Sequence, residues 1–322
     1  MFSFYLKQLC ALATAFFMLI GGLMTPLKDE DTEELYREKV ASVDIYENTI
    51  ETAIPQTELF NVISEHFSSA LPEGKTEKKA IVIGYDGCRA DTLVNCAESG
   101  AVSTLISDGG SAYIGYCGGV NYPGMNTQAT STAPGWCSIL TGQWADVHGI
   151  TANGIVKSND HLTLLTTLVE SKTVDSSAFY VSWNGHFKRS DSTYKEEKKY
   201  CEDKGLAVRF KDASGDNGTL NNTLRDLSKK DCSDFIFSIL EFTDHAGHNH
   251  GFFPERATYK YAFAKADSYA ATLISKIKSR ETYDTEDWLI ILTTDHGGFE
   301  KHHGSSSIQE RMTFIISNKG IL

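Results

Sequence analysis

Seven residues of this sequence combine the side-chain types and spacings of metal ligands. Some are paired: Asp244 and His248 are four residues apart, and Asp295 and His296 are adjacent. The full candidate set offers carboxylate, imidazole or hydroxyl donors and consists of Asp86, Thr132, Asp244, His248, Asp295, His296 and His303. Such oxygen and nitrogen ligands suit zinc best, with manganese or iron as the other candidates. The separate clusters predict a site for two divalent cations about 4 Å apart.

Thr132 is the candidate nucleophile of this set. It lies in a stretch, residues 127–142, that passes from small polar residues through Pro134 to apolar residues at helical spacing. Hydroxyl residues cap helices and proline is tolerated in the first turn, so we expect Thr132 at or near a helix N-terminus. Backbone N–H groups and the helix dipole favour a phosphate-like anion there. A threonine hydroxyl needs a base or a metal to become nucleophilic, and the predicted cations supply it.

Buried strands would position the three carboxylates. The apolar runs at residues 80–84, 234–240 and 288–292 are typical of such strands, and Asp86, Asp244 and Asp295 follow them in that order. Strands and helices alternate along the chain, which predicts an α/β fold with a mostly parallel central sheet covered by helices on both faces. Ligands of such sheets gather at the carboxyl ends of the strands, so we expect the metal site there.

The remaining pattern predicts further elements around this sheet. Helices are expected at residues 90–98, 162–170, 220–230 and 254–279, strands at 177–183 and 312–317, and a hairpin or loop at the glycine-rich residues 109–119. The long helix at 254–279 is expected to bury Tyr261, Ala262, Tyr269, Leu273 and Ile277. His245, His250 and His302 are interpreted as surplus to the ligand set, and His148 as structural.

The N-terminal segment is typical of a targeting sequence. An apolar run at residues 9–24 follows Lys7, which is compatible with a signal peptide or an uncleaved membrane anchor; the anchor is favoured. We expect residues 1–27 to form this segment, 28–77 an acidic connector with one amphipathic helix, and 78–322 the catalytic domain. In both versions the catalytic domain lies outside the cytoplasm, and the protein meets the membrane through this segment if it is uncleaved.

The charge of the chain restricts its partners. The net charge is −12, from 30 Lys and Arg against 42 Asp and Glu, which argues against a nucleic-acid-binding surface. An anionic small-molecule substrate would need a local positive centre, which bound cations provide. Six cysteines outside the N-terminal run could form disulfides in an oxidising compartment or pack in the core, and none has Cys-x-x-Cys spacing.

The motifs together resemble the nucleotide pyrophosphatase/phosphodiesterase branch of the alkaline phosphatase superfamily, from about residue 78 to residue 320. The matching motifs are Ile83-Gly-Tyr-Asp86-Gly-Cys-Arg89-Ala-Asp91, Thr132-Ala-Pro134, Thr141-Gly142, His148-Gly-Ile150, Asp244-x-x-Gly247-His248 and Asp295-His296-Gly297. The resemblance implies an alkaline-phosphatase-like fold and a two-zinc hydrolase that acts on small phosphodiesters or nucleotides through a phosphothreonine intermediate.

The resemblance also implies which residues hold each cation. One zinc would be held by Asp86, Thr132, Asp295 and His296, and the other by Asp244, His248 and a later histidine. We take His303 as this later ligand in preference to the adjacent His302.

Two positions depart from the patterns of the superfamily. The phosphodiesterase pattern has an asparagine three residues after the nucleophile, where this chain has Gly135, and this leaves diester against monoester preference open. Sulfatases have an arginine where this chain has Trp136, which argues against sulfatase activity. The alternatives are a phosphomonoesterase, phosphonate hydrolase or phosphoethanolamine transferase on the same two-metal core, or an inactive metal-binding extracellular domain.

Overall fold

A computed structural model describes residues 53–119 and 128–321 of the chain. The expected targeting segment, residues 1–27, lies outside this part and stays a prediction. Within the part of the chain that is described, no helix is both long enough and apolar enough to cross a lipid bilayer.

The described elements alternate between strands and helices along most of the chain. In chain order they are β1 (Ile54–Pro55), α4 (Glu58–Ser68), β2 (Glu77–Tyr85), the 3₁₀ helix η1 (Ala90–Asn95), α5 (Ala101–Ser107), β3 (Ser111–Tyr116), α6 (Thr132–Thr141), α7 (Ala145–His148), α8 (Leu164–Glu170), β4 (Ser177–Val181), α9 (Lys195–Lys204), β5 (Val208–Asp212), α10 (Asp216–Leu227), β6 (Phe235–Leu240), α11 (Phe242–His250), α12 (Ala257–Lys278), the 3₁₀ helix η2 (Tyr283–Thr285), β7 (Glu286–Thr293), α13 (Ile308–Arg311) and β8 (Met312–Ser317).

The strands form one eight-stranded sheet with the order β1-β3-β8-β7-β2-β6-β4-β5. Strand β8 pairs antiparallel with both β3 and β7, and the other strand pairings among the described residues are parallel. Strands β7, β2 and β6 are therefore adjacent and parallel, so their carboxyl ends meet at one edge. The predicted α/β fold with a mostly parallel sheet is confirmed.

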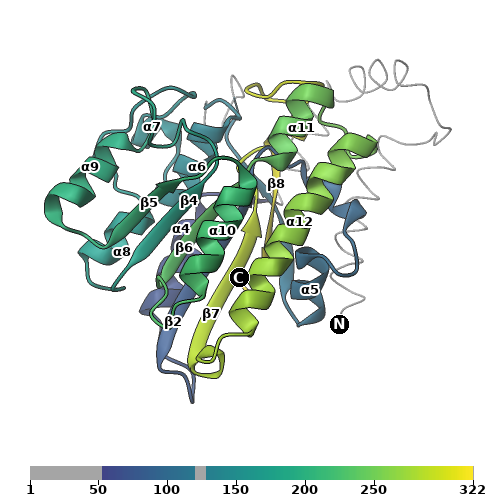
Figure 1. Ribbon diagram of the computed structural model, residues 1–322. Helices are drawn as coiled ribbons and strands as arrows, with labels where there is room; N and C mark the ends of the chain where they lie inside the picture. Colours follow the sequence, from purple (N-terminus) through teal and green to yellow (C-terminus); the bar gives the residue numbers. More distant parts are fainter. Residues whose placement is uncertain (1–52, 120–127, 322) are drawn as a thin grey trace.

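Helices cover both faces of this sheet (Figure 1). Strand β2 shows why, because its side chains alternate between two hydrophobic cores. Ile81 and Ile83 pack in the core that includes residues of α5 and α12. Ala80 and Val82 point to the opposite core, which includes residues of α4, α6 and α8. With both faces buried, the central strands β2, β6 and β7 carry the apolar runs that the sequence indicated.

Helix α4 lies in the segment expected to be a connector. Its residues Leu59 and Ile63 are almost fully buried in the second of these cores. Strand β1 of the same segment pairs with β3 at the edge of the sheet. The residues from Ile54 onward thus pack as part of the sheet and its covering layer.

Two local predictions are wrong. The glycine-rich residues 109–119 contain strand β3, which pairs with β8 over six residues; pairing with a buried neighbour overrides the weak local strand propensity. Tyr261, expected to be buried, is 71% exposed. The buried face of α12 instead includes Tyr259 and Phe263, because a helix turns its apolar face to the core every three to four residues.

Five cysteines of the described part are buried free thiols. Cys88, Cys117, Cys137, Cys201 and Cys232 are buried, and Cys96 is half-buried. The sequence left both disulfides and core packing open for these residues, and the described chain shows core packing.

Candidate metal centre and nucleophile

Three adjacent strands deliver the three candidate carboxylates to one edge of the sheet. Asp86 directly follows β2, and Asp295 comes two residues after the end of β7. Asp244 lies in the first turn of α11, which follows β6. Asp86 and Asp295 are fully buried and Asp244 is 8% exposed. The topology therefore explains why residues more than 200 positions apart in the sequence converge here.

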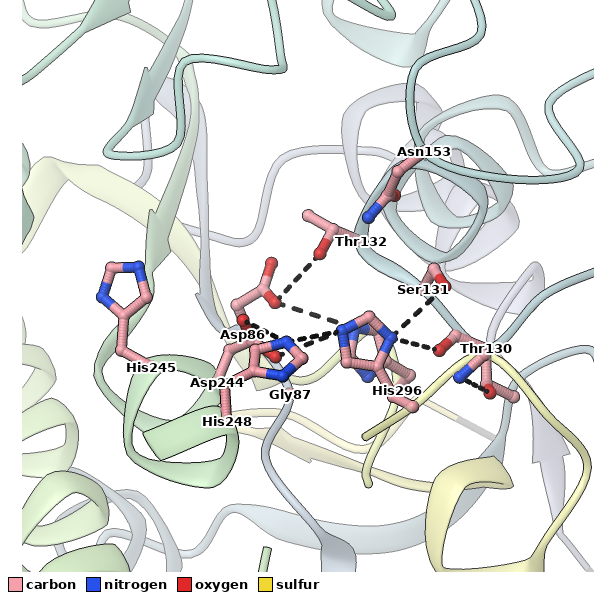
Figure 2. Close-up of polar contacts among 12 residues, drawn as sticks. Asp86, Gly87, Thr130, Ser131, Thr132, Asn153, Asp244, His245, His248 and His296 are labelled. Carbon is pink, nitrogen blue, oxygen red and sulfur yellow. Dashed lines mark hydrogen bonds and ion pairs between the residues drawn. The ribbon is translucent and has the colours of Figure 1, made fainter. Parts of the chain in front are cut away.

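The first group of ligand atoms contains Asp86, Asp295 and His296, which are close enough together to hold one metal ion. The Nε2 atom of His296 lies 3.7 Å from Asp86 Oδ1 and 3.4 Å from Asp295 Oδ2. The Thr132 hydroxyl donates to Asp86 Oδ1 at 3.3 Å. Figure 2 shows Thr132 directed toward this group.

The second group contains Asp244, His248 and His303. The Nε2 atoms of His248 and His303 each lie 3.5 Å from the Asp244 carboxylate. These two Nε2 atoms are 3.0 Å apart. Asp244, His296 and His303 also satisfy the geometry for one ion, so His296 stands between the groups. The His248 side chain is 43% exposed, and the centre therefore opens to solvent on this side.

Backbone carbonyls fix the tautomer of each of the three histidines. Nδ1 of His296 contacts Gly297 O at 2.6 Å, Nδ1 of His248 contacts Lys301 O at 3.0 Å, and Nδ1 of His303 contacts Thr130 O at 3.0 Å. Because a carbonyl oxygen only accepts, each Nδ1 carries the hydrogen and each Nε2 presents a lone pair. The close Nε2 atoms of His248 and His303 then repel each other unless a cation lies between them.

Unpaired buried atoms indicate that this donor set fits metal ions. Within the described residues, Asp244 Oδ1, Asp295 Oδ2 and His296 Nε2 are buried and have no hydrogen-bond partner. Buried polar atoms are almost always paired in folded proteins, so their convergence here needs an explanation. Carboxylate and imidazole donors around one space match the ligand preferences of zinc or manganese.

The pKa shifts of the metal-free centre also favour binding of a cation. Burial raises the pKa of Asp86 well above its usual range, and the charge of Asp244 raises it further. Burial, with the charge of Asp86, likewise raises the pKa of Asp295. Burial lowers the pKa of His296 and brings that of His303 to about 4. A cation would stabilise the ionised acids and needs the neutral imidazoles, so the centre favours binding one.

Trp136 and Gly87 hold the two deepest carboxylates in place. The indole Nε1 of Trp136 donates to Asp86 Oδ2 at 2.7 Å, and the backbone N–H of Gly87 donates to Asp295 Oδ1 at 3.2 Å. Gly87 has a φ of +62°, and a Cβ atom there would lie 2.7 Å from Asp244 Oδ1. This turn therefore requires glycine. Trp136 is fully buried and supports Asp86, which explains why position 136 carries no anion-binding arginine.

Gly135 marks the closest approach of helix α6 to Asp295. A Cβ atom at residue 135 would lie 2.8 Å from both the Cβ and the carbonyl oxygen of Asp295. A larger side chain at this position would displace the Asp295 backbone. The departure from the asparagine of the family pattern thus has a packing reason in this chain.

Thr132 is the first residue of α6, as its sequence context indicated. The N-terminal backbone donors of this helix are largely occupied, however. The N–H of Ala133 donates to Asn153 Oδ1 at 2.8 Å, and that of Gly135 donates to Ser131 O at 2.9 Å. Pro134 has no N–H. The expected anion contact at the helix start therefore relies on the helix dipole more than on free N–H groups.

Asn153 is a site residue that the sequence analysis missed. Its Oδ1 is held by the N–H of Ala133, and Figure 2 shows its amide nitrogen directed toward Thr132. The amide can thus donate to a group bound at the nucleophile. The sequence offers one signal for it, a polar residue in the turn after His148-Gly-Ile150, but only the fold shows that this turn reaches Thr132.

The other histidines lie apart from the two groups. The side chain of His245 is 67% exposed, and His250 and His302 are exposed as well. His148 is buried, and its Nε2 contacts the Ser138 hydroxyl at 3.1 Å within the core of α6 and α7. These positions agree with their interpretation as surface or structural residues. The metal-binding roles of the seven candidate residues stay predictions.

The sheet and its covering helices form an alkaline-phosphatase-like fold. Residues 80–308 match the sequence model of the type I phosphodiesterase / nucleotide pyrophosphatase family. Because this match covers most of the chain, the protein belongs to that family. No match was found among curated proteins.

Several solved structures match this chain at low sequence identity. A candidate sulfatase from Bacteroides thetaiotaomicron matches at 10% identity with a TM-score of 0.50, over 75% of this chain and 64% of that chain. Murine ectonucleotide pyrophosphatase / phosphodiesterase 5 matches at 19% identity with a TM-score of 0.45, over 68% of this chain. The matched part spans 57% of the murine protein. An inactive threonine-to-alanine variant of that protein, also 19% identical and with a TM-score of 0.45, was solved in complex with AMP; its match covers 69% of this chain and 57% of that one.

Proposed function

We propose that this protein hydrolyses phosphodiester or pyrophosphate bonds of small phosphorylated substrates, with two divalent cations and Thr132 as the nucleophile. Zinc is the first candidate for the cations and manganese the second. Family membership supports the hydrolase class. The observation that carries the metal proposal is the pair of Nε2 lone pairs of His248 and His303, which face each other at 3.0 Å beside Asp244.

Each cation would have its own set of residues. Asp86, Asp295 and His296, with the Thr132 hydroxyl, would hold the first cation, and Asp244, His248 and His303 the second. When bound, the cations supply Lewis acidity that lowers the pKa of the threonine hydroxyl and offsets charge on the departing oxygen.

Residues of the chain orient the Thr132 hydroxyl for attack on phosphorus. The hydroxyl hydrogen of Thr132 is directed to Asp86, which turns an oxygen lone pair toward the open side of the centre. Thr132 would lose its hydroxyl proton to water as Oγ1 forms a bond to phosphorus; the bond to the leaving oxygen would break, and that oxygen would take up a proton from water. Water then cleaves the phosphothreonine and regenerates the hydroxyl.

Asn153 supports the phosphoryl group during this transfer. Its carbonyl oxygen is held by the N–H of Ala133 at 2.8 Å, so the amide nitrogen is the group left to act as a donor. We assign this nitrogen to an equatorial phosphoryl oxygen, where a fixed donor stabilises developing charge. In this chain Asn153 thereby provides a polar donor that Gly135 lacks.

A comparison of two chromogenic esters tests the function. We expect the purified chain with zinc to hydrolyse bis-p-nitrophenyl phosphate faster than p-nitrophenyl phosphate, and a chelator to abolish both reactions. Preference for the monoester would retain the metal core and place the protein with the phosphomonoesterases. Bound zinc without turnover of either ester would favour the alternative of an inactive metal-binding domain.

A further inference from the structure

His303 is the one candidate ligand of the second group that neither a sheet end nor helix α11 positions. It lies in the loop between β7 and α13. Its Nδ1 contacts Thr130 O at 3.0 Å and Ser131 Oγ at 3.3 Å. The orientation of this ring is therefore set by residues that come some 170 positions earlier in the chain.

The side chain of Thr130 binds the same loop a second time. Its hydroxyl donates to Ser305 O at 2.9 Å and accepts from the N–H of Gly304 at 2.9 Å. Thr130 is 1% exposed, so water cannot readily replace these bonds. The backbone and the side chain of Thr130 together contact His303, Gly304 and Ser305.

The segment that holds this loop also carries the nucleophile. Thr130 and Ser131 directly precede Thr132, and Ser131 O accepts the N–H of Gly135 in the first turn of α6. The position of Thr132 and the orientation of His303 thus depend on the same few residues.

The other end of the His303 loop has an independent anchor. The Glu310 carboxylate accepts from the N–H of Ser305 at 2.9 Å and from the N–H of Ser307 at 3.0 Å. Ser307 and Glu310 also form a capping box at the start of α13. Loss of the Thr130 hydroxyl would therefore release Gly304 and Ser305, next to His303, from the nucleophile segment. The carbonyl contact to His303 and the far end of the loop would stay in place.

We propose that Thr130 is a positioning residue that clamps the His303 loop to the nucleophile segment, and that it sets the affinity of the second cation group. This inference rests on the metal centre of the proposed function. Residues that orient metal ligands typically change metal affinity by about 10- to 100-fold when they are replaced. Within the described part of the chain, no hydrogen bond joins Thr130 to Asp86, Asp295 or His296, so the affinity of the first group should change much less.

Substitutions at residue 130 separate the hydroxyl from the shape of the side chain. Thr130→Val removes the hydroxyl with little change in volume, and Thr130→Ser keeps it. Thr313→Val is the matched control, because Thr313 is equally buried and its hydroxyl has no hydrogen-bond partner in the described part of the chain. Each full-length variant would be compared with the wild type by calorimetric titration with Zn²⁺, with circular dichroism as the check on folding.

We expect wild type, Thr130→Ser and Thr313→Val to bind two zinc ions with the same two affinities. Thr130→Val should keep the affinity of the site that Asp295→Ala removes and lose about 10-fold or more at the site that His248→Ala removes. Unchanged affinities in folded Thr130→Val would overturn the clamp alone. Equal weakening of both sites would overturn it too. A wild type that binds no zinc would instead overturn the proposed function, and the clamp with it.

Discussion

The indole nitrogen of Trp136 donates to Asp86 Oδ2 at 2.7 Å, so a residue four positions after Thr132 fixes the carboxylate that the Thr132 hydroxyl contacts. The side chains of Trp136 and Asp86 are fully buried. Helix α6 thereby carries the Thr132 hydroxyl and, one turn later, the donor that holds Asp86. In the proposed function this makes the helix a structural part of the metal centre, which leads to the first prediction.

Trp136→Phe should weaken the first cation group while preserving the aromatic packing. A buried carboxylate that loses its donor is left unsatisfied, which costs about 1–3 kcal/mol of stability, and loss of such an outer contact lowers metal affinity by about 10- to 100-fold. Zinc titration and thermal unfolding would measure both effects. Trp288→Phe is the control, because it removes an indole bond of 2.8 Å to Glu286 away from the centre. It should lower stability and leave zinc affinity unchanged; equal zinc loss in both variants would refute the role of Trp136.

Asn153→Ala should lower kcat by about 10²- to 10³-fold, the usual effect of removing one preorganised donor. Asn153→Asp distinguishes positioning from catalysis, since an aspartate can still accept from the N–H of Ala133 but repels a phosphoryl oxygen. We expect Asn153→Asp to be at least as slow as Asn153→Ala, with zinc binding intact in both. Steady-state kinetics on the preferred ester would show this. A fully active Asn153→Asp enzyme would rule out the donor role.

Gly135→Ala should disturb Asp295, because the added Cβ would lie 2.8 Å from the Asp295 backbone oxygen. Overpacking of this kind costs about 1–3 kcal/mol, and we expect a lower Tm together with weaker binding of the first cation. Gly320→Ala is the matched control, since no atom lies within 4 Å of a Cβ at that position. Normal stability and zinc binding in Gly135→Ala would show that this close approach is unimportant.

Ionisation of Asp244 should lower the stability of the metal-free protein as the pH rises from about 4 toward 7. Burial raises the pKa of Asp244 from 3.8 to about 7. In this range the unfolded chain has released the proton that the folded chain keeps, so ionisation favours unfolding. Buried histidines such as His303, whose pKa is lowered to about 4, contribute in the opposite direction, so the contribution of Asp244 is measured as the Tm of chelator-treated wild type minus that of Asp244→Asn. This difference should fall as the pH rises. Zinc binding should strengthen over the same range, because the cation displaces that proton. A Tm difference that does not change with pH would contradict this assignment.

The sequence was sufficient to predict the sheet edge that gathers the carboxylates. Each of Asp86, Asp244 and Asp295 follows an apolar run, and runs of that kind form buried parallel strands because both of their faces are covered. The adjacency of β7, β2 and β6 comes from long-range pairing, which no local pattern contains. For the same reason β3 was missed, since its pairing with β8 rather than its composition makes it a strand.

The residues that position the candidate ligands and Thr132 could not be predicted from the sequence. Asn153 and Thr130 make hydrogen bonds to segments that are separate from them in the sequence, and neither belongs to a ligand-like pair. The prediction for Tyr261 is wrong for a different reason. Ala262, Leu273 and Ile277 define the buried face as expected, and Tyr261 lies off that face. Spacing thus indicates candidate ligands more readily than the residues that hold them in place.

The most direct test of the central claim is to trap the phosphorylated enzyme. Wild-type protein would be mixed with zinc and a diester substrate, quenched in acid during turnover, digested and analysed by mass spectrometry. We predict one phosphoryl group on the peptide that contains Thr132, and neither phosphorylation nor turnover in Thr132→Ala, with zinc still bound. Full turnover by Thr132→Ala, or a phosphoryl group on another residue, would contradict the assignment of Thr132 as the nucleophile.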